Sequence, residues 1–168
     1  TEAPSDFESN IYKAAEEGKL TSIQYLFDQC QADVEVKDED GWTPLHLSSY
    51  NGRIEVVKYL IEHCHANIET QDNDGWISLH FASANGKIDV VKYLIEQCHA
   101  NVEVKDKDGW TPLHRASQNG HIKVIKYLIE QCHANAEVQN KNGWTPLHRA
   151  SKSGEIEVIK YLIEQCHV

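Results

Sequence analysis

The chain has 168 residues, of which 40% are hydrophobic and 25% charged, a composition typical of one soluble globular domain or one repeat array. Its 16 basic and 26 acidic residues give a net charge of −10, which argues against general binding of nucleic acid or of anionic membrane surfaces. These residues contain no run of 18 apolar residues and no basic-then-apolar leader, so we expect neither a membrane-spanning helix nor a secretory signal.

A period of 34 residues runs through the sequence, and such self-similarity predicts a stacked array. Two neighbouring units, 74–107 and 108–141, are identical at 24 of 34 positions. The residues that recur at this spacing are Cys30, Cys64, Cys98, Cys132 and Cys166; Trp42, Trp76, Trp110 and Trp144; and Gly18, Gly52, Gly86, Gly120 and Gly154. We expect a polar lead-in over 1–6 and a single domain over 7–168, with five units at 7–39, 40–73, 74–107, 108–141 and 142–167.

The first unit is expected to close the N-terminal end of the stack. Its first helix is polar and carries Glu16 and Glu17 immediately before the turn at Gly18. Stacked arrays need a solvated unit at each end, because an internal unit would expose apolar surface there. This composition therefore suits an end cap.

The fourth unit illustrates the pattern of the internal units. Thr111 can cap a helix that begins at Pro112 and ends at Gly120, since Pro suits the first helical position and Gly the left-handed end. Apolar residues then recur at helical spacing over about 122–131, which predicts a second helix. The polar stretch 134–143 ends in Asn-Gly, a strong hairpin signal. Each unit is thus predicted as helix, turn, helix and projecting hairpin.

The fifth unit keeps the apolar residues of an internal unit up to the end of the sequence. No polar cap follows its second helix before Val168. We therefore hypothesise that the chain continues, or that this end packs on something, including self-association through the uncapped unit.

The segments that join each hairpin to the following helix resemble the ankyrin repeat. They read Asp-Gly-Trp-Thr-Pro-Leu-His at 40–46 and 108–114 and Asn-Gly-Trp-Thr-Pro-Leu-His at 142–148. The resemblance covers about residues 7–167 and implies an all-α ankyrin-repeat solenoid, made of helix-turn-helix units with β-hairpin loops. It also implies non-catalytic binding of a partner protein through the concave groove and the hairpin tips.

Some positions depart from the family pattern. The units have 34 residues where the family has about 33. His65, His99 and His133 stand where the family usually has Gly at the helix end, a left-handed position that His tolerates less well than Gly. In the third unit Ile77 and Ser78 replace Thr-Pro, so we expect the start of that helix to be the weakest.

The tryptophans are the first candidate binding residues. In the family, the position between Gly and Thr lies at the hairpin root and faces the concave side. Trp42, Trp76, Trp110 and Trp144 would then form a ladder, and Trp is enriched at binding hot spots. The alternative is that each Trp packs on the neighbouring hairpin and stiffens the array, and both roles can hold together.

Positions that vary between otherwise similar units are the second group of candidates. By the resemblance they line the concave groove, which runs from aromatic and acidic to basic. Residues 1–39 carry a net charge of −7 and 40–73 of −3, whereas 108–168 carry +1. We hypothesise a partner with an apolar surface at one end and acidic groups at the other; drift among solvated positions is the alternative. The varied candidates are Tyr50, Phe81, Arg115, Arg149 and Lys152, with Glu39, Asn73, Lys107 and Lys141 at the hairpin tips.

No catalytic, cofactor or metal site is predicted. Adjacent pairs such as Cys98-His99 recur, but neighbouring helical side chains diverge, and units about 10 Å apart cannot share one metal ion. The sequence has no Gly-rich phosphate loop and no Gly-x-Ser-x-Gly motif. The resemblance implies a structural role for the histidines of the stacking motif, His46, His80, His114 and His148. The tyrosines repeat in register and are therefore expected to serve helix packing, namely Tyr25, Tyr59, Tyr93, Tyr127 and Tyr161.

We therefore predict a non-catalytic module that binds another protein and needs no nucleic acid, membrane or cofactor. The main alternative is a structural part of a longer ankyrin scaffold array, or an engineered near-consensus repeat protein without a specific partner. Reduced, repeated cysteines favour an intracellular location, with the cytoplasm first and the nucleus or delivery into another cell as the alternatives.

Overall fold

The computed structural model describes residues 4–167 and shows an all-α solenoid. No strand occurs among these residues. The helices are α1 (Pro4–Glu17), α2 (Leu20–Asp28), α3 (Pro44–Tyr50), α4 (Ile54–Glu62), α5 (Ser78–Ala84), α6 (Ile88–Glu96), α7 (Pro112–Gln118), α8 (Ile122–Lys126), the π-helical turn η1 (Tyr127–Gln131), α9 (Pro146–Ser153) and α10 (Ile156–Cys166).

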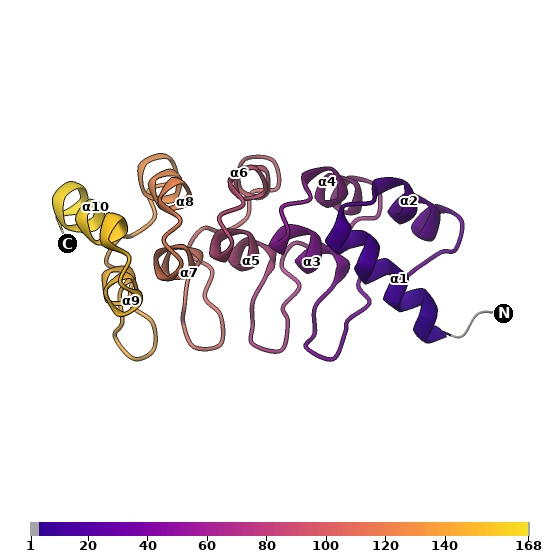
Figure 1. Cartoon of the computed structure of the whole chain (residues 1–168), viewed down its shortest axis with the longest axis horizontal. Coiled ribbons are helices and arrows are strands. Elements are labelled where there is room, and N and C mark those ends of the chain that lie inside the picture. The colour runs from indigo at the N-terminus through magenta and orange to yellow at the C-terminus, as the bar shows by residue number, and fades with distance from the viewer. Residues whose placement is uncertain (1–3, 168) are drawn as a thin grey trace.

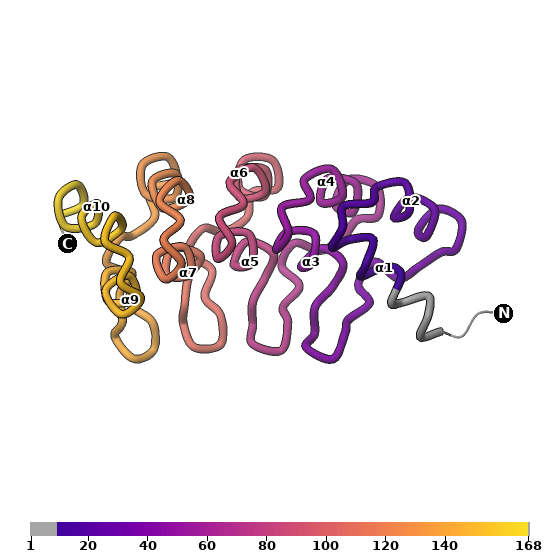
Figure 2. The backbone as a smooth tube through the Cα atoms, viewed as in Figure 1, coloured from indigo at the N-terminus to yellow at the C-terminus, as the bar shows by residue number. Residues whose placement is uncertain are grey.

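The helices form two rows along the long axis of the molecule (Figure 1). The first helices of the units, α1, α3, α5, α7 and α9, pack on one another in sequence order. The second helices lie in a parallel row beside them, each packed on the first helix of its own unit. The loops that follow α2, α4, α6 and η1 all project to the same side (Figure 2). Each unit therefore contacts only its neighbours, as the repeat predicts.

The helix starts follow the predicted capping pattern. In the second unit His46 N donates to Thr43 Oγ1 over 3.3 Å, and Thr43 N donates to His46 Nδ1 over 3.1 Å. In the third unit Ile77 has no hydroxyl to accept the first of these bonds, and only the bond from Ile77 N to His80 Nδ1, at 3.2 Å, remains. The predicted weakest helix start thus keeps half of its reciprocal cap.

The predicted left-handed histidines are confirmed. His65, His99 and His133 have φ of 58°, 58° and 56°, and the equivalent Gln31 in the first unit has φ of 53°. The following amide bonds back to the carbonyl oxygen six residues earlier, as in Ala100 N to Leu94 O at 3.0 Å. The second helices end here, at the predicted place.

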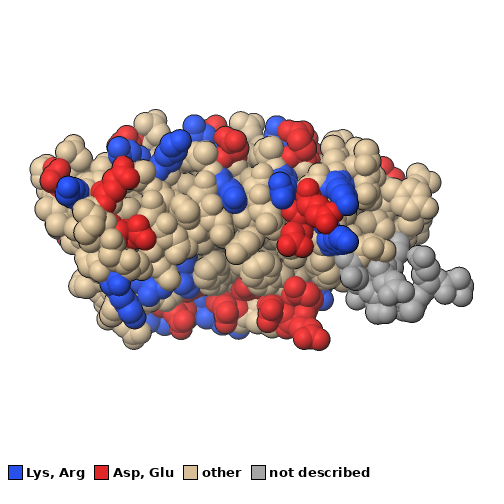
Figure 3. Space-filling view, in the orientation of Figure 1, with Lys and Arg blue, Asp and Glu red and all other residues tan. Residues whose placement is uncertain are grey.

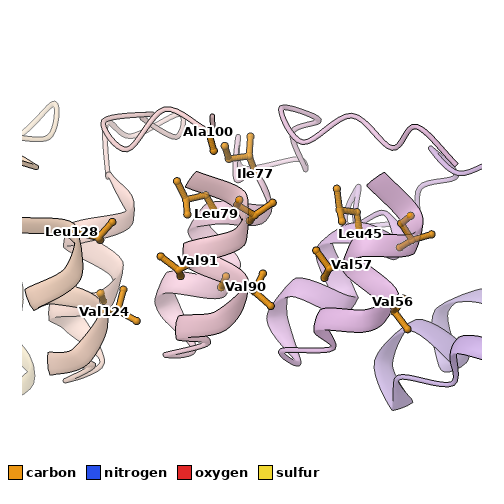
Figure 4. Close-up of a cluster of buried hydrophobic side chains, with 14 of the residues drawn as sticks. Leu45, Val56, Val57, Ile77, Leu79, Val90, Val91, Ala100, Val124 and Leu128 are labelled. Atoms are coloured by element: carbon orange, nitrogen blue, oxygen red, sulfur yellow. The ribbon is translucent and has the colours of Figure 1, made fainter. Parts of the chain in front are cut away.

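Apolar side chains from both rows fill the space between neighbouring units (Figure 4). In the second and third units, Leu45 and Leu79 come from the first helices and Val57 and Val91 from the second, and each is at most 1% exposed. Because each layer is completed by the next unit, the core is continuous along the stack.

The loops turn back as predicted but do not form β-hairpins. In the first loop Gly41 N donates to Asp38 O and Asp38 N to Trp42 O, both at 3.0 Å. The Asp38 carboxylate then accepts the amides of Asp40 and Trp42, at 3.0 and 2.8 Å. A side chain therefore organises the turn, and too few backbone pairs remain for a strand ladder.

The predicted boundary of the lead-in needs one correction. Helix α1 begins at Pro4, so residues 4–6 belong to the first helix rather than to a separate polar segment. Proline is favoured in the first turn of a helix because its missing N–H has no intrahelical partner there. Residues 1–3 of the predicted lead-in lie outside the described residues.

Candidate functional site

The nine predicted contact residues come together in one row along the stack. The tryptophans lie in the loop segments immediately before α3, α5, α7 and α9, and the varied residues lie on these helices. The order along the row, as fixed by ring and cation contacts, is Tyr50, Trp42, Phe81, Trp76, Arg115, Trp110, Arg149, Trp144 and Lys152. We call this set the aromatic–cation row.

The N-terminal end of the row is aromatic. The Trp42 ring centre lies 5.5 Å from that of Tyr50 and 4.4 Å from that of Phe81. On its other side Phe81 lies 5.0 Å from Trp76. Phe81 is only 2% exposed, so it contributes little contact area itself and instead separates two tryptophans. At this end the tryptophans do not contact each other directly, because Phe81 lies between Trp42 and Trp76.

The C-terminal end of the row alternates cations with indole rings. The Arg115 guanidinium lies 4.2 Å from the Trp76 ring centre, and the Arg149 guanidinium 4.4 Å from that of Trp110. Lys152 Nζ lies 5.2 Å from the Trp144 ring centre. Such cation–π contacts hold long side chains in place while the rings stay partly exposed.

A buried carboxylate fixes Arg115 in this row. Arg115 Nη2 lies 2.6 Å from Asp106 Oδ2, and the Arg115 and Asp106 side chains are 14% and 2% exposed. The other oxygen, Asp106 Oδ1, accepts the amides of Asp108 and Trp110 at 3.0 and 2.9 Å. One carboxylate thus shapes the loop and neutralises the arginine at the same time.

Arg149 lacks this counter-ion, because Asn140 stands where the previous unit has Asp106. Asn140 Oδ1 accepts the amides of Asn142 and Trp144, at 3.0 and 2.8 Å. The Nδ2 donor of Asn140 therefore points away from these two amides. That buried Nδ2 has no hydrogen-bond partner, and neither has the buried Nε of Arg149. Arg149 Nη2 donates to the Gln118 side chain, a neutral acceptor. Burial, followed by the charge of Arg115, lowers the pKa of Arg149 below its usual value.

His80 and His114 hydrogen-bond to the backbone of two tryptophans in the aromatic–cation row. His80 Nε2 and His114 Nε2 lie 3.0 and 2.9 Å from the carbonyl oxygens of Trp110 and Trp144 in the next unit. Because their Nδ1 atoms accept backbone amides, Nε2 carries the proton and donates. Desolvation lowers the pKa of both imidazoles to about 4. These residues are structural, as predicted, and their bonds join successive tryptophan positions.

The repeated tyrosines join the second helices of neighbouring units. Tyr93 Oη donates to Glu62 Oε1 and Tyr127 Oη to Glu96 Oε1, both at 2.8 Å. Burial, and then the bond to the acid, raises the pKa of each phenol. Tyr25 of the first unit is 62% exposed, since no earlier unit covers it. The tyrosines therefore serve helix packing, as predicted.

The cysteines and the remaining acids form no chemical site that the structure reveals. Within residues 4–167 no group of three or more His, Cys, Asp or Glu is placed to hold a metal ion. Burial raises the pKa of the Cys64, Cys98 and Cys132 thiols, which lowers their thiolate fraction. None of the helices in the same part of the chain has the length and apolar character needed to cross a membrane.

Charge is distributed unevenly over the loops. In the view of Figure 3, Asp and Glu gather below the N-terminal units and Lys and Arg below the C-terminal ones. Two of the predicted tip residues are used within the stack, because Asn73 Nδ2 donates to Glu39 O over 2.8 Å and Lys107 Nζ to Asn73 O over 2.6 Å. The tips therefore also serve the contact between units.

Sequence reasoning missed Asp72, Asp106 and Asn140. Their signal was present in the repeat, since Asp38, Asp72 and Asp106 occupy one position that becomes Asn140 in the fourth unit. The pairing of this position with the residue nine places later, as in Asp106 and Arg115, depends on the shape of the loop. That shape could not be read from helical or strand periodicity.

Comparison with known proteins gives a match along nearly the whole chain. A family model described as ankyrin repeats (3 copies) matches residues 11–106 and again residues 79–168. No curated protein matches the chain significantly. The two matched segments together include every member of the aromatic–cation row.

Proposed function

Because this chain belongs to the ankyrin repeat family, whose members are generally protein-interaction modules rather than enzymes, we propose that it binds a partner protein along the aromatic–cation row. The observation that carries the proposal is the preorganisation of this row. Its tryptophans and arginines are already held by ring contacts, an ion pair and backbone bonds. A surface whose side chains are fixed beforehand loses little conformational entropy on binding, so a few anchors suffice.

Arg149 is the arginine best suited to an acidic group of the partner. Arg115 is paired with Asp106, whereas Arg149 has the neutral Gln118 side chain as its hydrogen-bond acceptor. A carboxylate from the partner would supply the missing acceptor, since charge-assisted bonds to a guanidinium are stronger than neutral ones. This supports the hypothesis that the C-terminal end of the groove receives acidic groups.

The test compares capture of a partner by the chain and by a variant of the row. The immobilised chain is incubated with cell lysate, the retained protein is identified and purified, and its affinity is then measured. The test variant is Trp144→Ala, Arg149→Ala, Lys152→Ala, which spares the structural ion pair of Arg115. The control is Lys58→Ala, Lys92→Ala, two lysines of the second helices that contact Tyr93 and Tyr127 away from the row.

We expect the row variant to lose the partner and the control to keep it, with equal helical content in all three proteins. Equal affinity of all three would contradict binding through the row. A chain that retains no protein at all would favour the structural scaffold array or a near-consensus repeat protein without a partner.

The last unit favours self-association as a second, weaker contact. Ile156 is 61% and Ile163 is 49% exposed, whereas the equivalent Ile122 and Ile129 of the fourth unit are partly buried. Apolar side chains exposed at the end of a stack gain free energy when another surface covers them. The molecular mass in solution tests this, since a strict monomer at high concentration would exclude it. We also infer an intracellular location from the five free cysteines.

A further inference from the structure

Asp72 repeats the position of Asp106 without the arginine that Asp106 binds. Asp72 Oδ1 accepts the amides of Asp74 and Trp76, at 2.9 and 2.7 Å, just as Asp106 Oδ1 accepts the equivalent amides. Nine residues later, however, stands Phe81 instead of Arg115. Asp72 Oδ2 therefore has no hydrogen-bond or ion-pair partner among the described residues, although only 9% of Asp72 is exposed.

A pocket of about 390 Å³ opens beside this carboxylate. Its lining includes four aromatic side chains, Trp42, Tyr50, Trp76 and Phe81, and two acids, Asp72 and Asp74. Tyr50 is 39% exposed, so the pocket is open to solvent on that side. Aromatic faces beside carboxylates form a surface suited to an organic cation, because both attract positive charge.

The equivalent positions in the following units show which cation packs beside these tryptophans. In the next unit the Arg115 guanidinium lies 4.2 Å from the Trp76 ring centre and binds the carboxylate equivalent to Asp72, and in the fifth unit the Arg149 guanidinium lies 4.4 Å from the Trp110 ring centre. A guanidinium suits both contacts, since its planar face stacks on rings and its edge donates to carboxylate oxygens. We propose that the pocket binds an arginine side chain of the partner. Its guanidinium would pair with Asp72 as Arg115 pairs with Asp106, because Phe81 supplies no charge at this position. This inference rests on the proposed function.

The net charge of the N-terminal units supports a basic rather than an acidic or apolar occupant of the pocket. Residues 1–73 contain 5 basic and 15 acidic residues, a net charge of −10. Two loop lysines near Asp72 are already engaged, because Lys37 Nζ donates to Gln71 O over 2.8 Å and Lys107 Nζ to Asn73 O over 2.6 Å. With Arg149 suited to an acid at the other end of the row, the two sites would fix the direction in which the partner lies. The partner segment would carry an arginine at its end near Trp42 and an acidic residue at its end near Arg149.

The test uses N-acetyl-arginine N-methylamide as the probe and the tryptophan indole N–H signals as the readout. We expect saturable shifts of the Trp42 and Trp76 signals, and little change at Trp144. The lysine analogue is expected to bind several-fold more weakly and the glycine analogue not at all, because only the guanidinium stacks and donates along one edge. Equal binding of arginine and lysine, or shifts centred on Trp144, would overturn the assignment.

Two variants locate the site. Asp72→Asn keeps both loop bonds, as Asn140 shows at the same position, but removes the charge, so binding is expected to weaken about tenfold. Phe81→Arg places the chain's own guanidinium beside Asp72, as in the next unit, and should abolish probe binding. Unchanged probe binding in both variants would contradict the proposal.

The same variants separate this inference from the proposed function. A partner that binds the Asp72→Asn variant as tightly as the unaltered chain, yet fails to bind the Trp144, Arg149 and Lys152 variant, would overturn the arginine pocket and leave the proposed function standing. Probe binding that depends on Asp72, with no protein partner found, would support the pocket and count against the proposed function.

Discussion

Arg115 and Asp106 form a largely buried ion pair, with Nη2 and Oδ2 separated by 2.6 Å. The pair joins the loop that carries Trp110 to the first helix of the same unit. It also holds the guanidinium within 4.2 Å of the Trp76 ring centre and 5.6 Å of the Trp110 ring centre. The rigidity of the middle of the row therefore depends on a single buried carboxylate.

Replacing that carboxylate by an amide should destabilise the chain. Asp106→Asn keeps the two loop bonds but leaves Arg115 without its counter-ion, and we expect a loss of about 2 kcal/mol in the free energy of unfolding. Asp38→Asn is the matched control, because Asp38 makes the same two loop bonds and Leu47 stands in place of the arginine. Denaturant unfolding measures both. Equal losses in the two variants would show that the ion pair contributes nothing.

The reverse change should stabilise the last unit and weaken binding. Asn140→Asp replaces the unpartnered Nδ2 by an oxygen equivalent to Asp106 Oδ2, and Arg149 follows it by nine residues, as Arg115 follows Asp106. We expect a gain of about 1 kcal/mol in the free energy of unfolding. If Arg149 receives an acidic group of the partner, the internal counter-ion competes with it, and affinity should fall while stability rises. A variant that gains both stability and affinity would contradict this role of Arg149.

The contrast between these arginines and Phe81 shows how far the sequence could predict the site. The repeated capping residues were enough to place the starts of the first helices, and the resemblance to the ankyrin repeat predicted the left-handed histidines, because both depend on local chemistry repeated in register. The burial of side chains at the positions that vary between units was not predictable in this way. Phe81 and Arg115 occupy the same position, yet the apolar ring is buried between two tryptophans while the guanidinium needs a carboxylate from a loop. That difference comes from contacts across units, which periodicity does not describe.

Stability should fall on mild acidification because of the buried histidines. The pKa of His80 and of His114 is about 4 in the folded chain, against about 6.5 for an unfolded imidazole. Between these values the unfolded chain binds protons that the folded chain does not, so the free energy of unfolding decreases as pH falls below about 6.5. From pH 7 to pH 5 we expect a loss of about 2 kcal/mol for each histidine.

Unfolding midpoints measured across this pH range test the effect. His80→Gln should lower stability at pH 7, because the bond to the Trp110 carbonyl or to the Ile77 amide is lost, but should also flatten the pH dependence. A slope equal to that of the unaltered chain would show that His80 does not titrate with folding.

The helix start that the sequence predicts to be the weakest offers a stabilising change. Ser78 occupies the position held by Pro44 and Pro112 in the neighbouring units, and its buried hydroxyl has no hydrogen-bond partner. Ile77 already has the extended conformation, φ −105° and ψ 171°, that a residue before proline requires. Ser78→Pro should therefore stabilise the chain by about 1 kcal/mol, through a less flexible unfolded state and the loss of an unpaired polar group. Ser78→Ala removes only the hydroxyl and should show a smaller gain; destabilisation by proline would mean that the Ser78 amide is needed.

The left-handed histidines allow a second stabilising change with an internal control. His99 is exposed and has φ of 58°, a conformation in which a side chain is strained and glycine is not. His99→Gly should raise the free energy of unfolding by about 0.5–1 kcal/mol, since the relief of strain exceeds the entropy that glycine adds to the unfolded chain. Gln97, two residues earlier, is also exposed but has φ of −98°, so Gln97→Gly should lower stability by a similar amount. Opposite signs in the two variants, measured by denaturant unfolding, would show that backbone conformation decides the effect; equal signs would mean that the side-chain contacts of these residues outweigh it.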